Sequence, residues 1–142
     1  MHIVVTSHGS LCTGALEVVE MVAGKMPHIC AVSLPFDDTG QFAGSLREAV
    51  EGRLEEGVLV LCDIVGGTPY NEALRLSLEH PDRVSVLANM NMPMLLEAGF
   101  ALDAATSLDE LRRIALEAGV ESLRPSAQGG DLPAEGQEED LF

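Results

Sequence analysis

Four short apolar runs occur along the chain, and segments with a helical pattern separate them. The runs are continuous and rich in β-branched residues instead of alternating with polar ones, which is typical of strands buried on both faces. They cover residues 3–7, 29–34, 58–62 and 84–88. The helical segments between them cover residues 13–23, 40–54 and 69–79. This order of elements predicts a parallel sheet whose strands are connected by helices.

The segment 40–54 has the clearest helical pattern of the three. Its apolar residues are spaced by four and therefore lie on one face of a helix. They are Phe42, Leu46, Val50 and Leu54. After the fourth apolar run, Pro93 favours the start of a short helix, because proline is tolerated in the first helical turn.

A further helix is predicted toward the C-terminal part of the chain. Ser107 and Glu110 have the spacing of a capping box, in which side chains at the helix start satisfy free backbone amides. Gly119 favours the end of this helix after Ala118, because glycine commonly follows the last helical residue.

These elements predict an α/β fold with a doubly wound, mainly parallel four-stranded sheet and helices on both faces. The common strand order for such a sheet is 2-1-3-4, and ligands bind outside the carboxyl ends of the strands where the order reverses. That point lies between the first and third strands. His8 ends the first strand and Asp63 follows the third. If the order is 2-1-3-4, these two residues lie in neighbouring loops.

The chain has 142 residues and a net charge of −15, which argues against binding nucleic acid or an anionic membrane through general electrostatics. Residues 1–124 are predicted to form one domain. Residues 125–142 carry acidic but no basic side chains and are predicted to be a disordered tail. No apolar run approaches the roughly 20 residues that a membrane helix needs. The three cysteines form no CxxC pair, which favours a reduced, cytoplasmic protein.

The loop after the third apolar run has features of an anion site. Gly66 and Gly67 let the backbone approach a ligand closely, and Thr68 with Pro69 is a good N-cap and first helical residue. Free amides at that helix start can hold a phosphate. The alternative interpretation is a tight connection with no ligand. No lysine follows the glycines and no GxGxxG motif occurs, so the sequence predicts no nucleotide cofactor.

His8 and Asp63 together suggest nucleophilic chemistry. A carboxylate that accepts the hydrogen of one imidazole nitrogen leaves the other nitrogen with an exposed lone pair. Such a histidine can accept a phosphoryl group without a metal, with the helix amides and the Thr68 hydroxyl holding the oxygens. The alternative is a structural histidine beside a turn-forming aspartate. Two further alternatives are a Cys12 thiol enzyme with His8 as its base, and a zinc site of His8, Cys12 and Asp63.

Other histidines and a group of methionines are less informative. The histidines flank the apolar runs and are interpreted as solvated turn residues: His2, His28 and His80. The methionines surround Pro93: Met90, Met92 and Met94. They fit either the core or a flexible apolar docking surface.

Three sequence motifs accompany three of the predicted strands. They are SHGSLCTGAL at the first, LCDIVGGTPYNEAL at the third and NMPMLLEA after the fourth. Over residues 1–120 the chain thereby resembles the IIA domains of mannose-type sugar phosphotransferase systems. The resemblance implies that the phosphocarrier protein HPr phosphorylates His8, and that His8 passes the phosphoryl group to a IIB protein serving the membrane IIC/IID complex. It also implies that Asp63 orients His8, while Thr68 and the amides of Gly66 and Gly67 contact the phosphoryl group.

The resemblance further implies a homodimer with a C-terminal strand that pairs across subunits, and residues 120–123 are the candidate for this fifth strand. The leading hypothesis is a cytoplasmic phosphotransferase with a transient phosphohistidine. One alternative is a regulatory module controlled by histidine phosphorylation, and another is a small-molecule binding domain with no covalent step. A third is the phosphotransferase subunit of dihydroxyacetone kinase, although the GGTPYN loop fits the mannose-type family better.

Overall fold

The strands form one sheet, as the sequence predicts. A computed structural model describes residues 1–125 of the chain, and the predicted tail beyond Pro125 lies outside the described residues. The sheet has four parallel strands in the order β2-β1-β3-β4, which confirms the predicted class and strand order. The strands are β1 (His2–His8), β2 (Ile29–Leu34), β3 (Val58–Cys62) and β4 (Val84–Leu87).

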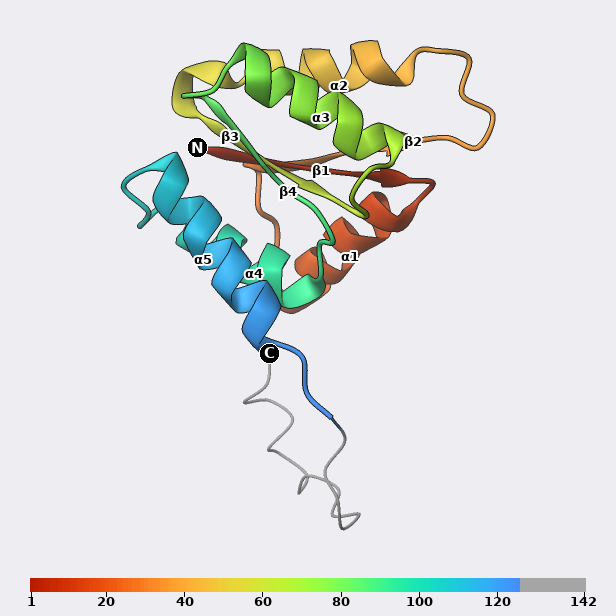
Figure 1. The fold of residues 1–142 in the computed structure, drawn as a ribbon. Helices are drawn as coiled ribbons and strands as arrows, with labels where there is room; N and C mark the ends of the chain where they lie inside the picture. Colours follow the sequence, from red (N-terminus) through yellow and green to blue (C-terminus); the bar gives the residue numbers. More distant parts are fainter. Residues whose placement is uncertain (126–142) are drawn as a thin grey trace.

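Helices cover both faces of this sheet (Figure 1). α2 and α3 lie on one face, and α1, α4 and α5 lie on the other. The helices are α1 (Leu11–Ala23), α2 (Phe42–Glu51), α3 (Thr68–Glu79), α4 (Met92–Ala101) and α5 (Leu108–Glu121). The predicted helix over 40–54 is shorter than expected, because a turn of 3-10 helix, η1 (Leu54–Glu56), follows it. Within residues 1–125, every helix is too short or too polar to span a membrane.

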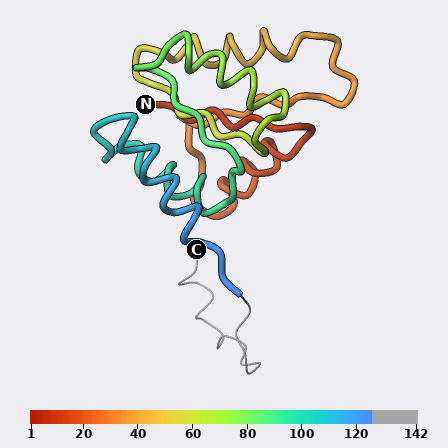
Figure 2. The backbone as a smooth tube through the Cα atoms, viewed as in Figure 1, coloured from red at the N-terminus to blue at the C-terminus, as the bar shows by residue number. Residues whose placement is uncertain are grey.

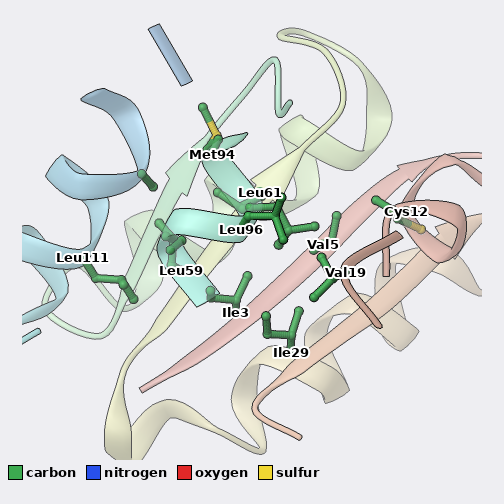
Figure 3. Close-up of a cluster of buried hydrophobic side chains, with 14 residues drawn as sticks. Ile3, Val5, Cys12, Val19, Ile29, Leu59, Leu61, Met94, Leu96 and Leu111 are labelled. Carbon is green, nitrogen blue, oxygen red and sulfur yellow. The ribbon is translucent and has the colours of Figure 1, made fainter. Parts of the chain in front are cut away.

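The two central strands, β1 and β3, are buried on both faces. Successive residues point to opposite sides, so Val4 and Val60 pack against α2 and α3, while Val5 and Leu61 pack against α1, α4 and α5 (Figure 3). The edge strands are less enclosed than predicted, because most of their residues are only half-buried. The central strands are therefore the most enclosed part of the sheet, and their carboxyl ends are well-supported positions for a functional site.

The predicted fifth strand over residues 120–123 is wrong, because α5 continues through Val120 to Glu121. Gly119 does not end the helix. It is buried, and a Cβ atom there would lie 2.7 Å from Cε of Met94 in α4, so glycine lets the two helices pack closely. The Gly119 carbonyl accepts hydrogen bonds from Nδ2 of the Asn91 side chain at 3.0 Å and from the Ser122 hydroxyl at 2.8 Å. The homodimer thus has no strand to support it in residues 1–125 and stays a prediction.

The start of α5 agrees with the sequence in most details. The Ser107 hydroxyl accepts a hydrogen bond from the Glu110 amide at 3.1 Å, as in a capping box. The Glu110 carboxylate turns to Thr106 instead of Ser107, and accepts from the Thr106 amide at 2.8 Å and the Thr106 hydroxyl at 2.6 Å. These bonds lower the pKa of Glu110. The helix start is therefore stabilised one residue further upstream than the motif predicts.

Candidate active site

His8 and Asp63 meet where the strand order reverses. β1 ends at His8, and Asp63 directly follows the neighbouring strand β3, so the two loops lie side by side at one edge of the sheet (Figure 2). The Oδ2 atom of Asp63 accepts two hydrogen bonds from His8. One comes from the backbone amide at 2.9 Å and the other joins ring atom Nδ1 at 2.7 Å. The predicted juxtaposition of these two residues is confirmed.

The environment of the two side chains differs. The Asp63 side chain is only 9% exposed, whereas the His8 ring is 47% exposed. Burial by itself raises the pKa of Asp63, but the hydrogen bonds from the His8 amide and ring outweigh it, so the pKa lies below its ordinary value. An ionised Asp63 accepts the hydrogen on Nδ1 and leaves the lone pair on Nε2 of His8 free to face solvent. This arrangement suits a nucleophile at Nε2.

Gly67 lies directly against the His8 ring. A Cβ atom at position 67 would be 2.6 Å from Cε1 of His8 and 3.3 Å from Nε2. Any side chain would therefore collide with the imidazole, although the φ of −79° at Gly67 is open to every residue. Gly66 has a φ of +81°, in the region that favours glycine. The two positions thus favour glycine for different reasons. Gly66 adopts the backbone conformation of the loop, and Gly67 leaves room for the His8 ring.

The amino end of α3 lies next to the same ring. Gly67, not Thr68, is the N-cap, so the prediction for Thr68 is one residue out. Thr68 is the first helical residue and is exposed, and Pro69 follows it in the first turn. The backbone amides of a first turn have no partner within their own helix. Those of Thr68 and Tyr70 are thus available for an anion, directly after Gly67, whose missing Cβ would lie 3.3 Å from Nε2 of His8.

The turn that leads from His8 into α1 is held by residues that the sequence analysis did not single out. Gly9 has a φ of +56°, and its carbonyl accepts hydrogen bonds from the hydroxyls of Ser7 at 3.2 Å and Ser33 at 2.5 Å. The Ser7 hydroxyl also accepts from the Cys12 amide at 2.8 Å. Ser7 and Ser33 face each other across β1 and β2. Their role becomes visible only from the strand register, since neither serine belongs to a motif that would indicate it.

The comparisons with known proteins agree with this geometry. The family model EIIA-man, described as PTS system fructose IIA component, matches residues 2–116. The chain belongs to this family of phosphotransferase-system IIA components. The IIA protein is 32% identical over 127 residues to the mannose-specific EIIAB component of Escherichia coli K12. That match covers 86% of this chain but 38% of the relative, so the chain spans well under half of the relative's length.

Two further relatives have lengths closer to that of this IIA protein. The fructose-specific EIIA component of Bacillus subtilis is 34% identical over 100 residues, covering 67% of this chain and 66% of that protein. The solved mannose/sorbose specific IIA subunit from Enterococcus faecalis superposes with a TM-score of 0.78 at 26% identity, covering 93% of this chain and 96% of that one. The IIA protein is therefore a mannose-type component of the sugar phosphotransferase system.

The geometry argues against a cysteine nucleophile in this IIA protein. Cys12 is completely buried and packs in the core beneath the sheet, so its thiol cannot meet a substrate. The same burial counts against the alternative zinc site of His8, Cys12 and Asp63.

A second cysteine, Cys62, lies at the end of β3, next to Asp63. Burial, with a smaller contribution from the Asp63 charge, raises the pKa of the Cys62 thiol to about 12. A thiol with such a pKa stays protonated and is a poor nucleophile at neutral pH.

Apolar side chains are exposed in the two segments that carry the site. Leu11 begins α1 after His8, and Ile64 and Val65 follow Asp63; each is more than half exposed. Beside Leu11 is an apolar hollow of about 380 Å³, between the first turns of α1 and the segment from Met90 to Met92. Met94 belongs to the buried core, and Met90 and Met92 are partly buried against it while they line the hollow, so the core role is confirmed and the docking role stays a prediction. Exposed apolar side chains in the segments that carry an acceptor atom suit the docking of another protein.

Proposed function

We propose that this IIA protein is a cytoplasmic phosphohistidine relay, in which His8 accepts a phosphoryl group from HPr and passes it to a IIB protein or domain. The IIB component then phosphorylates the sugar at the membrane IIC/IID complex. The observation that supports the proposal most directly is the His8 ring, which Asp63 holds at Nδ1 while Nε2 faces solvent beside the start of α3.

The chemistry needs no group beyond the two proteins. The lone pair on Nε2 attacks the phosphorus of the donor, and the bond between phosphorus and the donor breaks with its electron pair returning to the donor. The phosphorylated ring keeps its hydrogen on Nδ1 and carries a positive charge, which the Asp63 carboxylate stabilises at 2.7 Å. The amides of Gly66, Gly67, Thr68 and Tyr70, with the Thr68 hydroxyl, hold the phosphoryl oxygens. Transfer to IIB reverses these steps.

A labelling experiment tests the relay. The protein is incubated with phosphoenolpyruvate labelled in its phosphate, enzyme I and HPr, and the product is treated with acid and with alkali. We expect one equivalent of label per chain, labile to acid and stable to alkali, on the peptide that contains His8. Absence of label in the complete mixture would refute the proposal.

Discharge of the label separates transport from regulation. The labelled protein is isolated and mixed with the IIB domain of a mannose-type system. We expect the label to move to IIB within the time that one transport cycle takes. Label that forms on His8 but is not discharged to any IIB would instead favour a regulatory module controlled by phosphorylation.

Replacing Asp63 tests the orienting role. We expect Asp63→Asn to slow phosphorylation by HPr about 10- to 100-fold at pH 7, because a neutral amide compensates the positive charge of the phosphorylated ring poorly. The amide still fills the site, so the far-UV circular dichroism spectrum should not change. Single-turnover kinetics with labelled HPr measures the rate. A rate equal to that of the wild type would remove Asp63 from the mechanism.

The difference in stability between the wild type and Asp63→Asn should depend on pH. The pKa of Asp63 is lower in the folded chain, so its contribution to the free energy of unfolding is fully present above the unfolded pKa of about 3.9 and is lost as the pH falls through the folded pKa. The difference in stability between wild type and Asp63→Asn should therefore be constant above about pH 5 and shrink below about pH 4. Urea unfolding across that range measures it.

A further inference from the structure

A second cluster of chemically active side chains lies at the opposite edge of the sheet from His8. β1 begins at this edge, beside Met1 (Figure 2). The cluster contains His2 in β1, His28 in the turn before β2, and Glu56 at the end of η1. Two backbone hydrogen bonds of 2.9 Å fix these segments to one another: the His2 amide donates to the Gly57 carbonyl, and the Ile3 amide donates to the His28 carbonyl. The fold therefore holds the three backbone segments together, and only the side chains are free to adjust.

The side chains of this cluster converge. Nε2 of His2 lies 3.3 Å from Oε2 of Glu56, and the centroids of the His2 and His28 rings are 5.0 Å apart. One nitrogen from each histidine and one Glu56 oxygen all lie within 4.8 Å of one another. The prediction of a solvated turn residue is wrong for His2, which belongs to β1 and whose side chain is only 16% exposed. His28 and Glu56 are exposed and free to adjust.

We propose that His2, His28 and Glu56 bind a divalent transition metal of the zinc class. Two imidazole nitrogens and one carboxylate oxygen are a common zinc ligand set, with water as a fourth ligand. Bonds of about 2.0–2.1 Å in a tetrahedron place ligand atoms about 3.4 Å apart. The 3.3 Å between His2 and Glu56 matches this spacing, and rotation of the exposed His28 ring brings in the third ligand.

The surrounding charges are compatible with a cation at Glu56. The same Oε2 atom lies 3.6 Å from the amino nitrogen of Met1, so this carboxylate already faces a positive group that a metal would replace. A second group with ligand-like spacing is paired to a cation more closely. It contains Glu51, Glu79 and His80, and the Arg47 guanidinium forms ion pairs with both of these glutamates, at 2.7 Å for Glu79. The Glu56 carboxylate is 60% exposed and its ion pair with Met1 is longer, so it is the easier of the two groups for a metal to enter.

A metal at this cluster would join three segments that are distant in sequence. It would link the start of β1, the turn before β2 and the end of η1, far from the phosphoryl site. We therefore expect it to stabilise the fold and to leave phosphotransfer unchanged. Zinc should raise the melting temperature of the wild type in proportion to the logarithm of its free concentration above the dissociation constant.

Calorimetric titration with zinc chloride at pH 7.5 tests the proposal, using the full chain without a histidine tag. We expect one zinc per wild-type chain, and at least 10-fold weaker binding for His28→Gln and for Glu56→Gln. His80→Gln and His8→Gln are matched controls and should bind as the wild type does. Both variants in the cluster change exposed side chains, and circular dichroism confirms their fold.

Three results would overturn the proposal. The first is a wild-type chain that binds no zinc. The second is an undiminished affinity in His28→Gln or Glu56→Gln. The third is a loss of binding in His8→Gln, which would place the metal at the phosphoryl site. Replacement of zinc by cobalt supplies an independent measurement, because a tetrahedral site gives strong visible absorption that an octahedral aqueous ion lacks.

Discussion

His8→Ala is expected to abolish phosphoryl uptake from HPr, with a fall of at least about 1,000-fold in the rate of labelling. The variant lacks the nitrogen that accepts the phosphoryl group, and two neighbouring groups in the described part of the chain are too enclosed to replace it. Cys12 is buried in the core, and the carboxylate of Asp63 is only 9% exposed. Labelling of the purified variant in the complete mixture measures the effect.

The fold of His8→Ala should survive. The imidazole is 47% exposed and belongs to neither core cluster. Its loss leaves Asp63 with the backbone hydrogen bond from residue 8, so we expect a destabilisation of about 1 kcal/mol, measured by urea unfolding. His80→Ala and His28→Ala serve as controls for the loss of a histidine elsewhere and should keep full labelling. Undiminished label in His8→Ala would show that another residue is the acceptor and would end the proposal for His8.

Much of the fold could be predicted, because apolar runs and helix-start residues mark the elements within short stretches of the sequence. The continuous apolar runs at residues 29–34 and 58–62 coincide with β2 and β3, and Asn91 with Pro93 starts α4 near the predicted residue. The strand order was predicted as the common order for such a sheet, and the strand pairing confirms it. The end of α5 could not be predicted, because glycine is ambiguous in sequence. Glycine is the residue type that commonly follows the last helical residue, but in the folded chain the missing Cβ of Gly119 makes room for Met94.

The candidate site shows the same division between local and distant information. His8 and Asp63 stand at strand ends, so a rule about sheet edges brings them together, and the structure confirms their contact. Ser33 holds the Gly9 carbonyl from another strand, and nothing in its own neighbourhood in the sequence indicates this contact. The sequence also does not predict the contact of His2 with Glu56, because it joins the amino end of β1 to a residue between the predicted helix 40–54 and the next strand, where the pattern indicates no element.

Gly67→Ala is expected to reduce the rate of phosphorylation of His8 about 100-fold while leaving the chain folded. The added Cβ would lie 2.6 Å from Cε1 of the ring, closer than carbon atoms can approach without contact strain. The ring can relieve the contact only by swinging toward solvent, which breaks its 2.7 Å hydrogen bond to Asp63. Misplacement of a reacting group by about 1 Å costs on the order of 100-fold in rate. Single-turnover transfer from labelled HPr measures this effect.

The position of the ring can be followed separately from the rate. Nitrogen NMR of the His8 imidazole reports which ring nitrogen carries the hydrogen, and we expect Gly67→Ala to lose the single tautomer that Asp63 imposes in the wild type. A variant with normal tautomer and normal rate would show that the close approach of Gly67 has no part in positioning His8. A slower rate with the tautomer unchanged would instead place the effect on the phosphoryl oxygens at the start of α3.

Two other glycines distinguish this steric effect from the general consequences of adding a methyl group. Gly44 lies within α2 with no atom near its missing Cβ, so Gly44→Ala should leave phosphorylation unchanged and stabilise the chain by up to about 1 kcal/mol. Gly66→Ala meets no atom within 4 Å, but it forces alanine to a φ of +81°, which costs about 1–2 kcal/mol of stability. Gly67→Ala should show the reverse: little change in stability, because its φ of −79° is ordinary, and a large loss of rate. If Gly66→Ala and Gly67→Ala lose rate and stability in the same proportion, the cause is the backbone of the loop and not the contact with His8.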